Sequence, residues 1–256
     1  MLEGSVIWIT GAGSGIGRAC ALAFAEAGAR VALTGRRATP LEETAALTGR
    51  PEDALIVPAD LTEPGQLEAA HQRIVADWGD PDVLVNNAGW NIGRRHWHEI
   101  SPEAMSGVVD LLLKAPFHAS LLVLPAMRAR RQGTIVQIAS LAGVMIHPVS
   151  GPSYTAAKHA MVAMSDSLNA EEGINGIRSV CICPGETATP ILDTRPRPPS
   201  AAERALMMQP EDVAAAVLFA VTLPPRACVT RMVLQPTDDN AFRAQARAIA
   251  GAAEPA

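Results

Sequence analysis

The sequence predicts an α/β domain in which helices cover both faces of a doubly wound parallel sheet of about seven strands. Two observations support this fold class. Short runs rich in β-branched residues alternate with longer helical stretches, as strand–helix–strand repeats do. The runs are apolar at consecutive positions, which is typical of parallel strands buried on both faces.

Each element follows from its hydrophobic pattern and from the turn residues at its ends. Strands are predicted over residues 5–10, 31–34, 55–57, 83–86, 134–139, 177–182 and 229–234. Helices are predicted over residues 15–27, 64–78, 102–130, 153–170 and 211–221. Because crossovers between parallel strands are right-handed, this order predicts a Rossmann-like sheet that binds ligands at the carboxyl ends of its strands.

The chain is expected to form a single domain, since its composition shows no break. The domain is predicted over residues 1–240, with a substrate loop at about 190–208 whose Pro- and Arg-rich part is 193–202. Residues 241–256 form an Ala-rich, weakly specified tail. The 256 residues and the 48% of hydrophobic residues suffice for one large core.

Charge and apolar patterning argue against several classes of partner. The net charge of −5 disfavours nucleic acid and anionic membranes. The apolar stretches 108–113 and 120–124 are too short to cross a bilayer, and the N-terminus lacks a signal-peptide pattern, so a cytoplasmic location is expected. The four cysteines have no disulfide-framework spacing, and Cys181 and Cys183 alternate in a strand, so both should be buried on one face.

A glycine-rich turn joins the first predicted strand to the first predicted helix. It reads Thr-Gly-Ala-Gly-Ser-Gly-Ile-Gly over residues 10–17. Glycines allow the backbone to turn tightly beside a pyrophosphate, and the helix N-terminus supplies free N–H groups for phosphates. An ordinary strand-to-helix turn is the alternative interpretation. The strand and helix context favours a dinucleotide, with contacts expected from Gly11, Ser14, Gly15, Ile16 and Gly17.

The end of the second strand indicates which dinucleotide is bound. An acidic residue there accepts a hydrogen bond from the ribose of NAD, whereas arginine binds the 2′-phosphate of NADP. No acidic residue lies between Val31 and Pro40, and Arg36 is the better placed of two adjacent arginines. The alternative is that Arg36 and Arg37 are solvated turn residues. We expect NADP(H) to be favoured over NAD(H).

A tyrosine and a lysine lie one helical turn apart in the sequence Tyr154-Thr-Ala-Ala-Lys158. A phenol ionises too weakly to serve as a base at neutral pH, and a neighbouring ammonium lowers its pKa. Ser140 follows a predicted strand, where a hydroxyl can bind the substrate oxygen. A surface Tyr–Lys pair is the alternative, but the glycine turn favours Ser140, Tyr154 and Lys158 as catalytic residues.

These motifs together resemble the classical short-chain dehydrogenase/reductase family over about residues 4–236. The resemblance implies that Lys158 also holds the nicotinamide ribose and that Tyr154 exchanges a proton with the substrate oxygen. It also implies three further cofactor-binding segments. These segments are Asp60 and Leu61 beside the adenine, Asn87, Ala88 and Gly89 in the cleft, and Pro184, Gly185 and Thr189 around the nicotinamide.

One position departs from the family pattern. The family's catalytic asparagine precedes a Leu-Lys-Gly/Ala-x-Phe stretch, and Leu112 stands at that place here. Asp110 comes two residues too early and is expected to point to another side of the helix. Since the resemblance implies that the asparagine holds a water behind the lysine, turnover is expected to be reduced or unusually pH-dependent. A main-chain carbonyl offers an alternative ligand for that water.

The walls of the cleft are expected from residues 90–97, 141–153 and 190–208. They contain four arginines, which are Arg94, Arg95, Arg195 and Arg197. One of them could bind an anionic end of the substrate, but solvated loop arginines are the interpretation we favour. The stretch 223–236 resembles the subgroup that oxidises hydroxy acids such as serine. His96 and His98 have no third ligand, so no metal site is expected.

The resulting prediction is an oxidoreductase that moves a hydride between NADP(H) and a small alcohol or ketone, including hydroxy acids. A cofactor-binding regulatory or scaffold protein is the first alternative, which Leu112 alone favours. A lyase or epimerase on the same scaffold is the second. Association is expected, because the Ala and Met side chains of helix 153–170 suit pairing with a symmetric copy. The family resemblance implies a homodimer or homotetramer.

Overall fold

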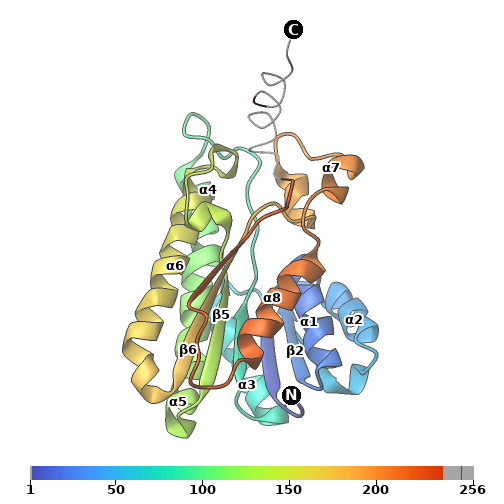
Figure 1. Ribbon diagram of the computed structural model, residues 1–256, viewed down its shortest axis with the longest axis vertical. Coiled ribbons are helices and arrows are strands. Elements are labelled where there is room, and N and C mark those ends of the chain that lie inside the picture. The colour runs from blue at the N-terminus through green and yellow to red at the C-terminus, as the bar shows by residue number, and fades with distance from the viewer. Residues whose placement is uncertain (1, 239–248, 250–256) are drawn as a thin grey trace.

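A seven-stranded parallel sheet forms the centre of the protein, as predicted. The computed structural model describes residues 2–238 and 249. The strands are β1 (Val6–Thr10), β2 (Arg30–Gly35), β3 (Ala54–Pro58), β4 (Val83–Asn86), β5 (Gly133–Ile138), β6 (Ile177–Pro184) and β7 (Arg231–Leu234). Their order across the sheet is β3-β2-β1-β4-β5-β6-β7 (Figure 1). The order reverses at β1, so the sheet is doubly wound.

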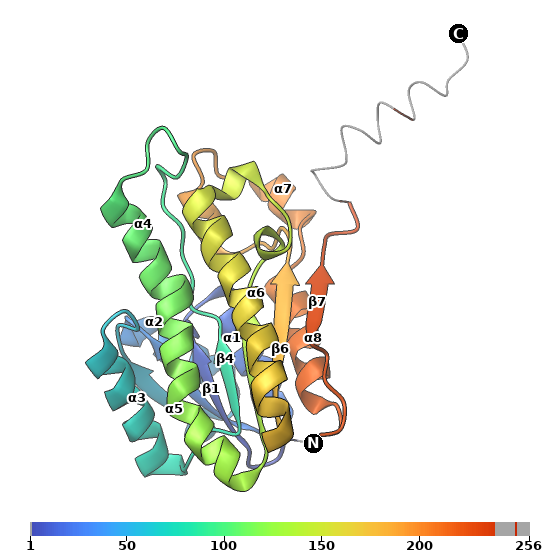
Figure 2. The same ribbon diagram turned by 90° about the vertical axis from the view of Figure 1, so that its left-hand side faces the viewer.

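Helices cover both faces of the sheet (Figure 2). One layer holds α1 (Gly15–Glu26), α2 (Ala38–Leu47) and α8 (Pro210–Thr222), and the other holds α3 (Pro64–Trp78), α4 (Pro102–Val109), α5 (Ala115–Arg130) and α6 (Pro152–Glu172). Strand residues alternate between the two cores: Ile7 and Ile9 pack toward the first layer, and Trp8 packs toward the second. The strands are therefore buried on both faces, which explains their continuous apolar runs.

The long predicted helix over residues 102–130 is continuous but not uniform. It consists of α4, a π-helical turn at Asp110–Lys114 and α5. The apolar stretches 108–113 and 120–124, which the sequence analysis treated separately, join within it. By length and composition alone this helix could cross a membrane. Its inner side packs in the core through residues such as Ala119 and Met127, which explains its apolar composition in this structure.

Two helices were missed by the sequence analysis. Helix α2 has Pro40 in its first turns and buries only Leu41, Thr44 and Ala45, so its hydrophobic pattern is weak. The predicted loop 193–202 leads into a short helix, α7 (Ala201–Ala205), which begins with a capping box between Ser200 and Glu203. Apart from residue 249, the predicted tail 241–256 lies outside the described residues.

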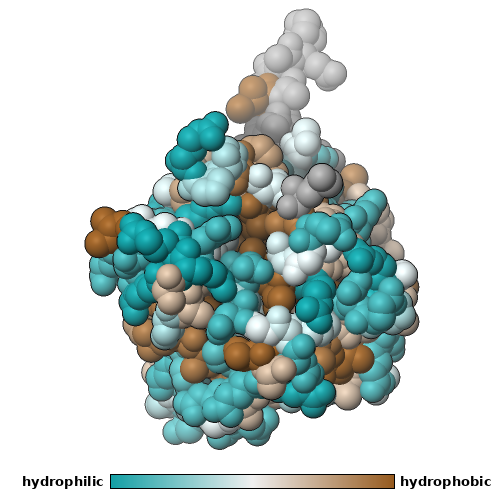
Figure 3. Space-filling view, turned by 90° about the horizontal axis from the view of Figure 1, so that it is seen from below, coloured by the Kyte–Doolittle hydropathy of each residue, from teal (hydrophilic) through white to brown (hydrophobic). Residues whose placement is uncertain are grey.

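The carboxyl ends of all strands meet at one edge, at the top of Figure 1, where the functional site is expected. Helix α7 also lies at this end of the molecule. On the face that Figure 3 shows from below, hydrophilic side chains cover most of the surface and hydrophobic ones gather in small groups. In the core, Trp8 donates a hydrogen bond from Nε1 to the Thr34 hydroxyl at 2.9 Å, which joins β1 to β2.

Candidate functional site

The glycine-rich turn lies where the strand order reverses, between β1 and β4. The Asn87 side-chain amide donates hydrogen bonds to the carbonyls of Thr10 and Gly11, at 3.0 and 3.1 Å. The Thr10 hydroxyl accepts from the backbone N–H groups of Asn87 and Ala88, at 3.0 and 3.1 Å. Asn87 thus holds the two strand ends together, a structural role that the sequence analysis did not assign to it.

Two glycines of this turn have no space for a side chain. Gly11 has a φ of +66°, and a Cβ there would lie 2.7 Å from the Cα of Ala88. A Cβ on Gly17 would lie 2.3 Å from the carbonyl oxygen of Gly11. Gly17 therefore allows α1 to begin directly against the turn, and the free N–H groups of its first residues face the site.

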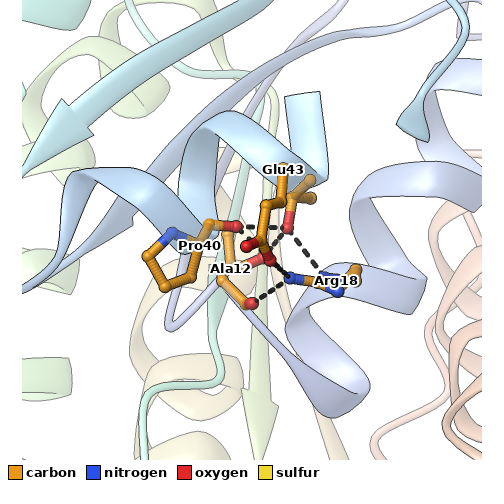
Figure 4. Close-up of polar contacts among 6 residues, drawn as sticks. Ala12, Arg18, Pro40 and Glu43 are labelled. Carbon is orange, nitrogen blue, oxygen red and sulfur yellow. Dashed lines mark hydrogen bonds and ion pairs between the residues drawn. The ribbon is translucent and has the colours of Figure 1, made fainter. Parts of the chain in front are cut away.

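Arg18 and Thr44 fasten the turn to α2 (Figure 4). The Arg18 guanidinium donates to the Gly13 carbonyl at 2.7 Å and to the Thr44 hydroxyl at 3.0 Å, and it forms an ion pair with Glu43 at 3.0 Å. The Thr44 hydroxyl in turn lies 3.0 Å from the Ala12 carbonyl. Because these contacts satisfy the carbonyls of the turn, its N–H groups remain directed toward the cavity.

A cavity of about 580 Å³ extends from this turn to Tyr154. Thirteen predicted site residues line it: Gly11, Ser14, Gly15, Ile16, Arg36, Asn87, Gly89, Ser140, Tyr154, Lys158, Pro184, Gly185 and Thr189. The remaining predicted residues, Gly17, Asp60, Leu61 and Ala88, lie outside its lining. The Asp60 carboxylate accepts hydrogen bonds from the backbone and hydroxyl of Thr62, and Leu61 is buried in the core. Their place beside an adenine stays a prediction.

The cavity fits a phosphorylated dinucleotide. Its first part combines glycines that leave backbone accessible with the N-terminus of α1. At the end of β2 its wall consists of Gly35, Arg36 and Arg37, and both arginines are exposed. Among the described acidic residues, only Glu186 lines the cavity, beyond the end of β6. A phosphate near Arg36 would therefore meet positive charge without a neighbouring carboxylate in the wall.

Ser140, Tyr154 and Lys158 come together at the carboxyl ends of β5 and β6. Ser140 lies two residues beyond the end of β5 and caps the short 3-10 helix Leu141–Gly143, where its hydroxyl accepts from the Ala142 N–H at 3.1 Å. Tyr154 and Lys158 lie in the first turns of α6, and the Lys158 Nζ lies 5.7 Å from the centre of the Tyr154 ring. Lys158 Nζ also donates to the Ile138 carbonyl at 2.7 Å. The predicted trio is thus one constellation.

Burial controls the titration of these side chains. It raises the pKa of Tyr154, against a hydrogen bond from Ser140 and the charges of Arg195 and Arg95, which lower it. Burial also lowers the pKa of Lys158 to about 8. The four-residue spacing predicts that Lys158 lowers the pKa of Tyr154, but in this structure desolvation of the phenol outweighs the groups that favour its ionised form.

Leu112 occupies the middle of the π-helical turn and is fully buried. It packs in one cluster with Val108, Ala157 and the partly buried Tyr154. Asp110 instead forms an ion pair with Lys114 at 2.7 Å, so it points to another side of the helix, as expected. The position next to Tyr154 is therefore apolar, within a π-helical turn.

The loop arginines divide into two pairs. The side chains of Arg94 and Arg197 are 83% and 91% exposed, in line with the solvated interpretation. That interpretation is wrong for Arg95, which is buried, and for Arg195, since both line the cavity. Sequence reasoning could not separate these neighbours, because contacts with distant residues decide which side chain is buried.

Cys181 and Cys183 lie on one face of β6, with their sulfurs 3.8 Å apart in a buried cluster. This confirms the expected orientation. The rings of His96 and His98 stack with centroids 6.1 Å apart. In the part of the chain that the structure describes, no group of three or more potential ligands gathers for a metal ion.

Comparison with known proteins identifies the family. The family model for short chain dehydrogenase matches residues 5–199. The chain belongs to the short-chain dehydrogenase family. It is 38% identical over 191 residues to the bovine (Bos taurus) dehydrogenase/reductase SDR family member 7B, covering 72% of this chain but only 58% of that relative. The seven-stranded sheet is thus that of a known family of oxidoreductases.

Solved structures with the same fold contain nicotinamide cofactors. The 3-ketoacyl-(acyl-carrier-protein) reductase from Brucella melitensis, complexed with NADH, is 27% identical and has a TM-score of 0.84, covering 93% of this chain and 99% of its own. The closed form of a serine dehydrogenase complexed with NADP⁺ is also 27% identical with a TM-score of 0.84, covering 92% and 96%. Both cofactor types therefore occur among proteins of this fold.

Tyr154 is the only tyrosine of the protein, so tyrosinate absorbance in an alkaline titration reports on this residue alone. We expect its ionisation above the ordinary pKa of 10.0, because burial disfavours the charged phenolate. Ser140→Ala is expected to move the ionisation to still higher pH, since the Ser140 hydrogen bond lowers the pKa. Circular dichroism at each pH controls for unfolding. Ionisation of the folded protein below the ordinary value contradicts this prediction.

Leu112→Asn tests the apolar position beside Tyr154. The amide enters a cluster of Val108 and Ala157 without a polar partner there, so unfolding free energy should fall by about 1–3 kcal/mol. We also expect a changed pH profile of kcat, because an amide at this place can hold a water near Lys158. Leu112→Met is the matched apolar control. Identical pH profiles for the Asn variant and the wild type would mean that this side chain takes no part in proton transfer.

Proposed function

We propose that the protein transfers a hydride between NADP(H) and a small alcohol or ketone, with Tyr154 as the acid/base. The observation that carries this proposal is the arrangement of Ser140, Tyr154 and Lys158 in the same cavity as the glycine-rich turn. The bound cofactor supplies the hydride or accepts it. The residues of the chain bind and orient the substrate and move the proton.

The raised pKa of Tyr154 keeps the phenol protonated at neutral pH, as an acid that donates to a carbonyl oxygen must be. Ser140 offers a second hydrogen bond to that oxygen and stabilises the negative charge that develops on it. Lys158 is held by the Ile138 carbonyl, and a pKa of about 8 lets it exchange a proton near neutral pH. In the oxidative direction the same groups act in reverse.

NADPH consumption against a panel of small ketones and aldehydes tests the function, with the absorbance of the reduced nicotinamide as the readout. We expect turnover by the wild type and a loss of about a hundredfold or more in kcat for Tyr154→Phe, which keeps the ring but removes the proton donor. Cofactor binding by the variant serves as the control. Bound NADPH that no carbonyl oxidises would instead favour a regulatory or scaffold protein.

The proposed preference for NADP(H) rests on Arg36, because the part of the cavity wall at the end of β2 contains no carboxylate. We expect Arg36→Ala to raise KM for NADPH by about ten- to hundredfold, because a charge-assisted contact to the 2′-phosphate is lost. KM for NADH should change little, since that cofactor has no 2′-phosphate. Arg37→Ala is the matched neighbour and should have the smaller effect. Equal catalytic efficiency of the wild type with both cofactors contradicts the preference.

We also propose that the protein works as a homodimer or homotetramer in the cytoplasm. The outer sides of α5 and α6 border an apolar groove, and Phe117 and Leu121 in α5 are 51% and 52% exposed there. Ala160 and Ala163 of α6 form its other side. An apolar surface of this kind on adjacent helices suits an isologous contact with a second copy.

Leu121→Asp should therefore weaken assembly. Light scattering is expected to give a dimer or tetramer for the wild type and a smaller species for the variant, because a carboxylate would be buried in the contact. Leu47→Asp is the matched control, since Leu47 is an exposed leucine on α2, on the other layer of the molecule. A monomeric wild type at micromolar concentration contradicts the proposed assembly.

A further inference from the structure

Arg95 is buried in the cavity wall, and the carboxylate of Glu99 accepts from its backbone N–H at 3.0 Å rather than from its guanidinium. Its residue is only 3% exposed, and no described acidic side chain forms an ion pair with its guanidinium. One guanidinium nitrogen donates to the backbone carbonyl of Thr194 and to the Thr194 hydroxyl. The Nε–H group is buried and has no hydrogen-bond partner among the described residues. A charged group thus retains an unused donor beside the site.

Arg195 adds a second guanidinium to the same part of the cavity. It forms an ion pair with Glu186 at 2.8 Å. Burial lowers the pKa of Arg95, and the charge of Arg195 lowers it further, so the two guanidinium groups disfavour each other. Both also act electrostatically on the Tyr154 hydroxyl. Two guanidinium groups thus act on the Tyr154 hydroxyl, and Glu186 is the only described acidic residue that lines the same cavity.

The cofactor does not account for these arginines. Its phosphates are expected at the glycine-rich turn and Arg36, at the ends of β1 and β2. Arg95, in the loop after β4, and Arg195, after β6, instead act electrostatically on Tyr154. A purely structural role in holding the loop at Thr194 does not account for Arg95 either, because these contacts leave its Nε–H without a hydrogen-bond partner. Burial of a guanidinium without an anion costs free energy, because the charged group loses its hydration. An anion that enters the site compensates for this lost hydration.

We propose that Arg95 and Arg195 bind a carboxylate of the substrate, which makes the substrate a small hydroxy acid or keto acid. This inference rests on the proposed function, since Tyr154 must reach the hydroxyl or carbonyl oxygen of the same molecule. A guanidinium binds a carboxylate through parallel N–H donors, which fixes both position and orientation. Arg95 and Arg195 are thus specificity-determining residues that place the reacting carbon relative to Tyr154 and Ser140.

Matched pairs of 2-keto and 3-keto acids and their methyl esters test this inference with the full chain and NADPH. We expect the wild type to prefer the acids by about tenfold or more in kcat/KM. Arg95→Gln should lower kcat/KM for the acids by about ten- to hundredfold, mainly through KM, and change the ester values less than about threefold. Arg195→Gln should act in the same direction, whereas Arg197→Gln, in the same loop but exposed, should leave both classes unchanged.

A merely structural role of Arg95 would lower the activity toward acids and esters equally, which would overturn the inference. So would a wild type that prefers esters, or one that prefers a phosphorylated ketone such as dihydroxyacetone phosphate to every acid. In all these cases NADPH is consumed and the proposed function stands.

If NADPH is not consumed, a binding experiment distinguishes the proposed carboxylate site from the proposed hydride transfer. Butyrate and butyramide differ in charge, and neither carries a carbonyl that the enzyme can reduce. In the presence of NADPH, butyrate should raise the melting temperature of the wild type and not that of Arg95→Gln, and butyramide should raise neither. The absence of a rise with butyrate in the wild type would overturn carboxylate binding, whether or not the protein turns over other substrates.

Discussion

The hydrogen bonds between Thr10 and Asn87 join β1 and β4 at the point where the strand order reverses, and the rest of the site depends on them. At this point the connections that follow β1 and β4 run to opposite faces of the sheet. This divergence leaves a crevice beyond the strand ends. Asn87 closes the base of this crevice because its backbone N–H donates to the Thr10 hydroxyl and its side-chain amide donates to the carbonyls of Thr10 and Gly11. Gly11 and Gly17 then bring the turn and α1 against the same point without steric conflict.

From this base the site extends in two directions with different chemistry. Toward β2 it is open, with exposed arginines and backbone N–H groups held in place by Arg18 and Thr44. Toward β6 it is buried, and Tyr154 and Lys158 lose solvation there. Water can screen the first part, which suits a phosphate contact. Its exclusion from the second part strengthens each hydrogen bond that acts on the reacting oxygen.

In the proposed function, substrate recognition comes from loops rather than from the sheet. The wall around Tyr154 contains two segments, one with Arg95 and one from Pro190 to Arg195. Several helices and strands separate these segments in the sequence. The hydrogen bonds from Arg95 to Thr194 hold these two segments together. A change in either loop therefore alters the position of the other, while the Ser140, Tyr154 and Lys158 constellation stays fixed to β5 and α6. The proposal thus places hydride chemistry and substrate choice in separate parts of the fold.

The sequence by itself determined the sheet, its order of elements and most of the site. These features follow from local patterns, namely continuous apolar runs, the glycine turn and the four-residue spacing of Tyr154 and Lys158. Each pattern lies within a short stretch of sequence, so it can be recognised without knowledge of distant contacts. Only the tertiary structure decided which of the adjacent residues Arg94 and Arg95 is solvated and which is buried, since Thr194 is 99 residues away from Arg95. It also decided the direction in which the pKa of Tyr154 shifts, because the desolvation of the phenol depends on every segment that packs around it.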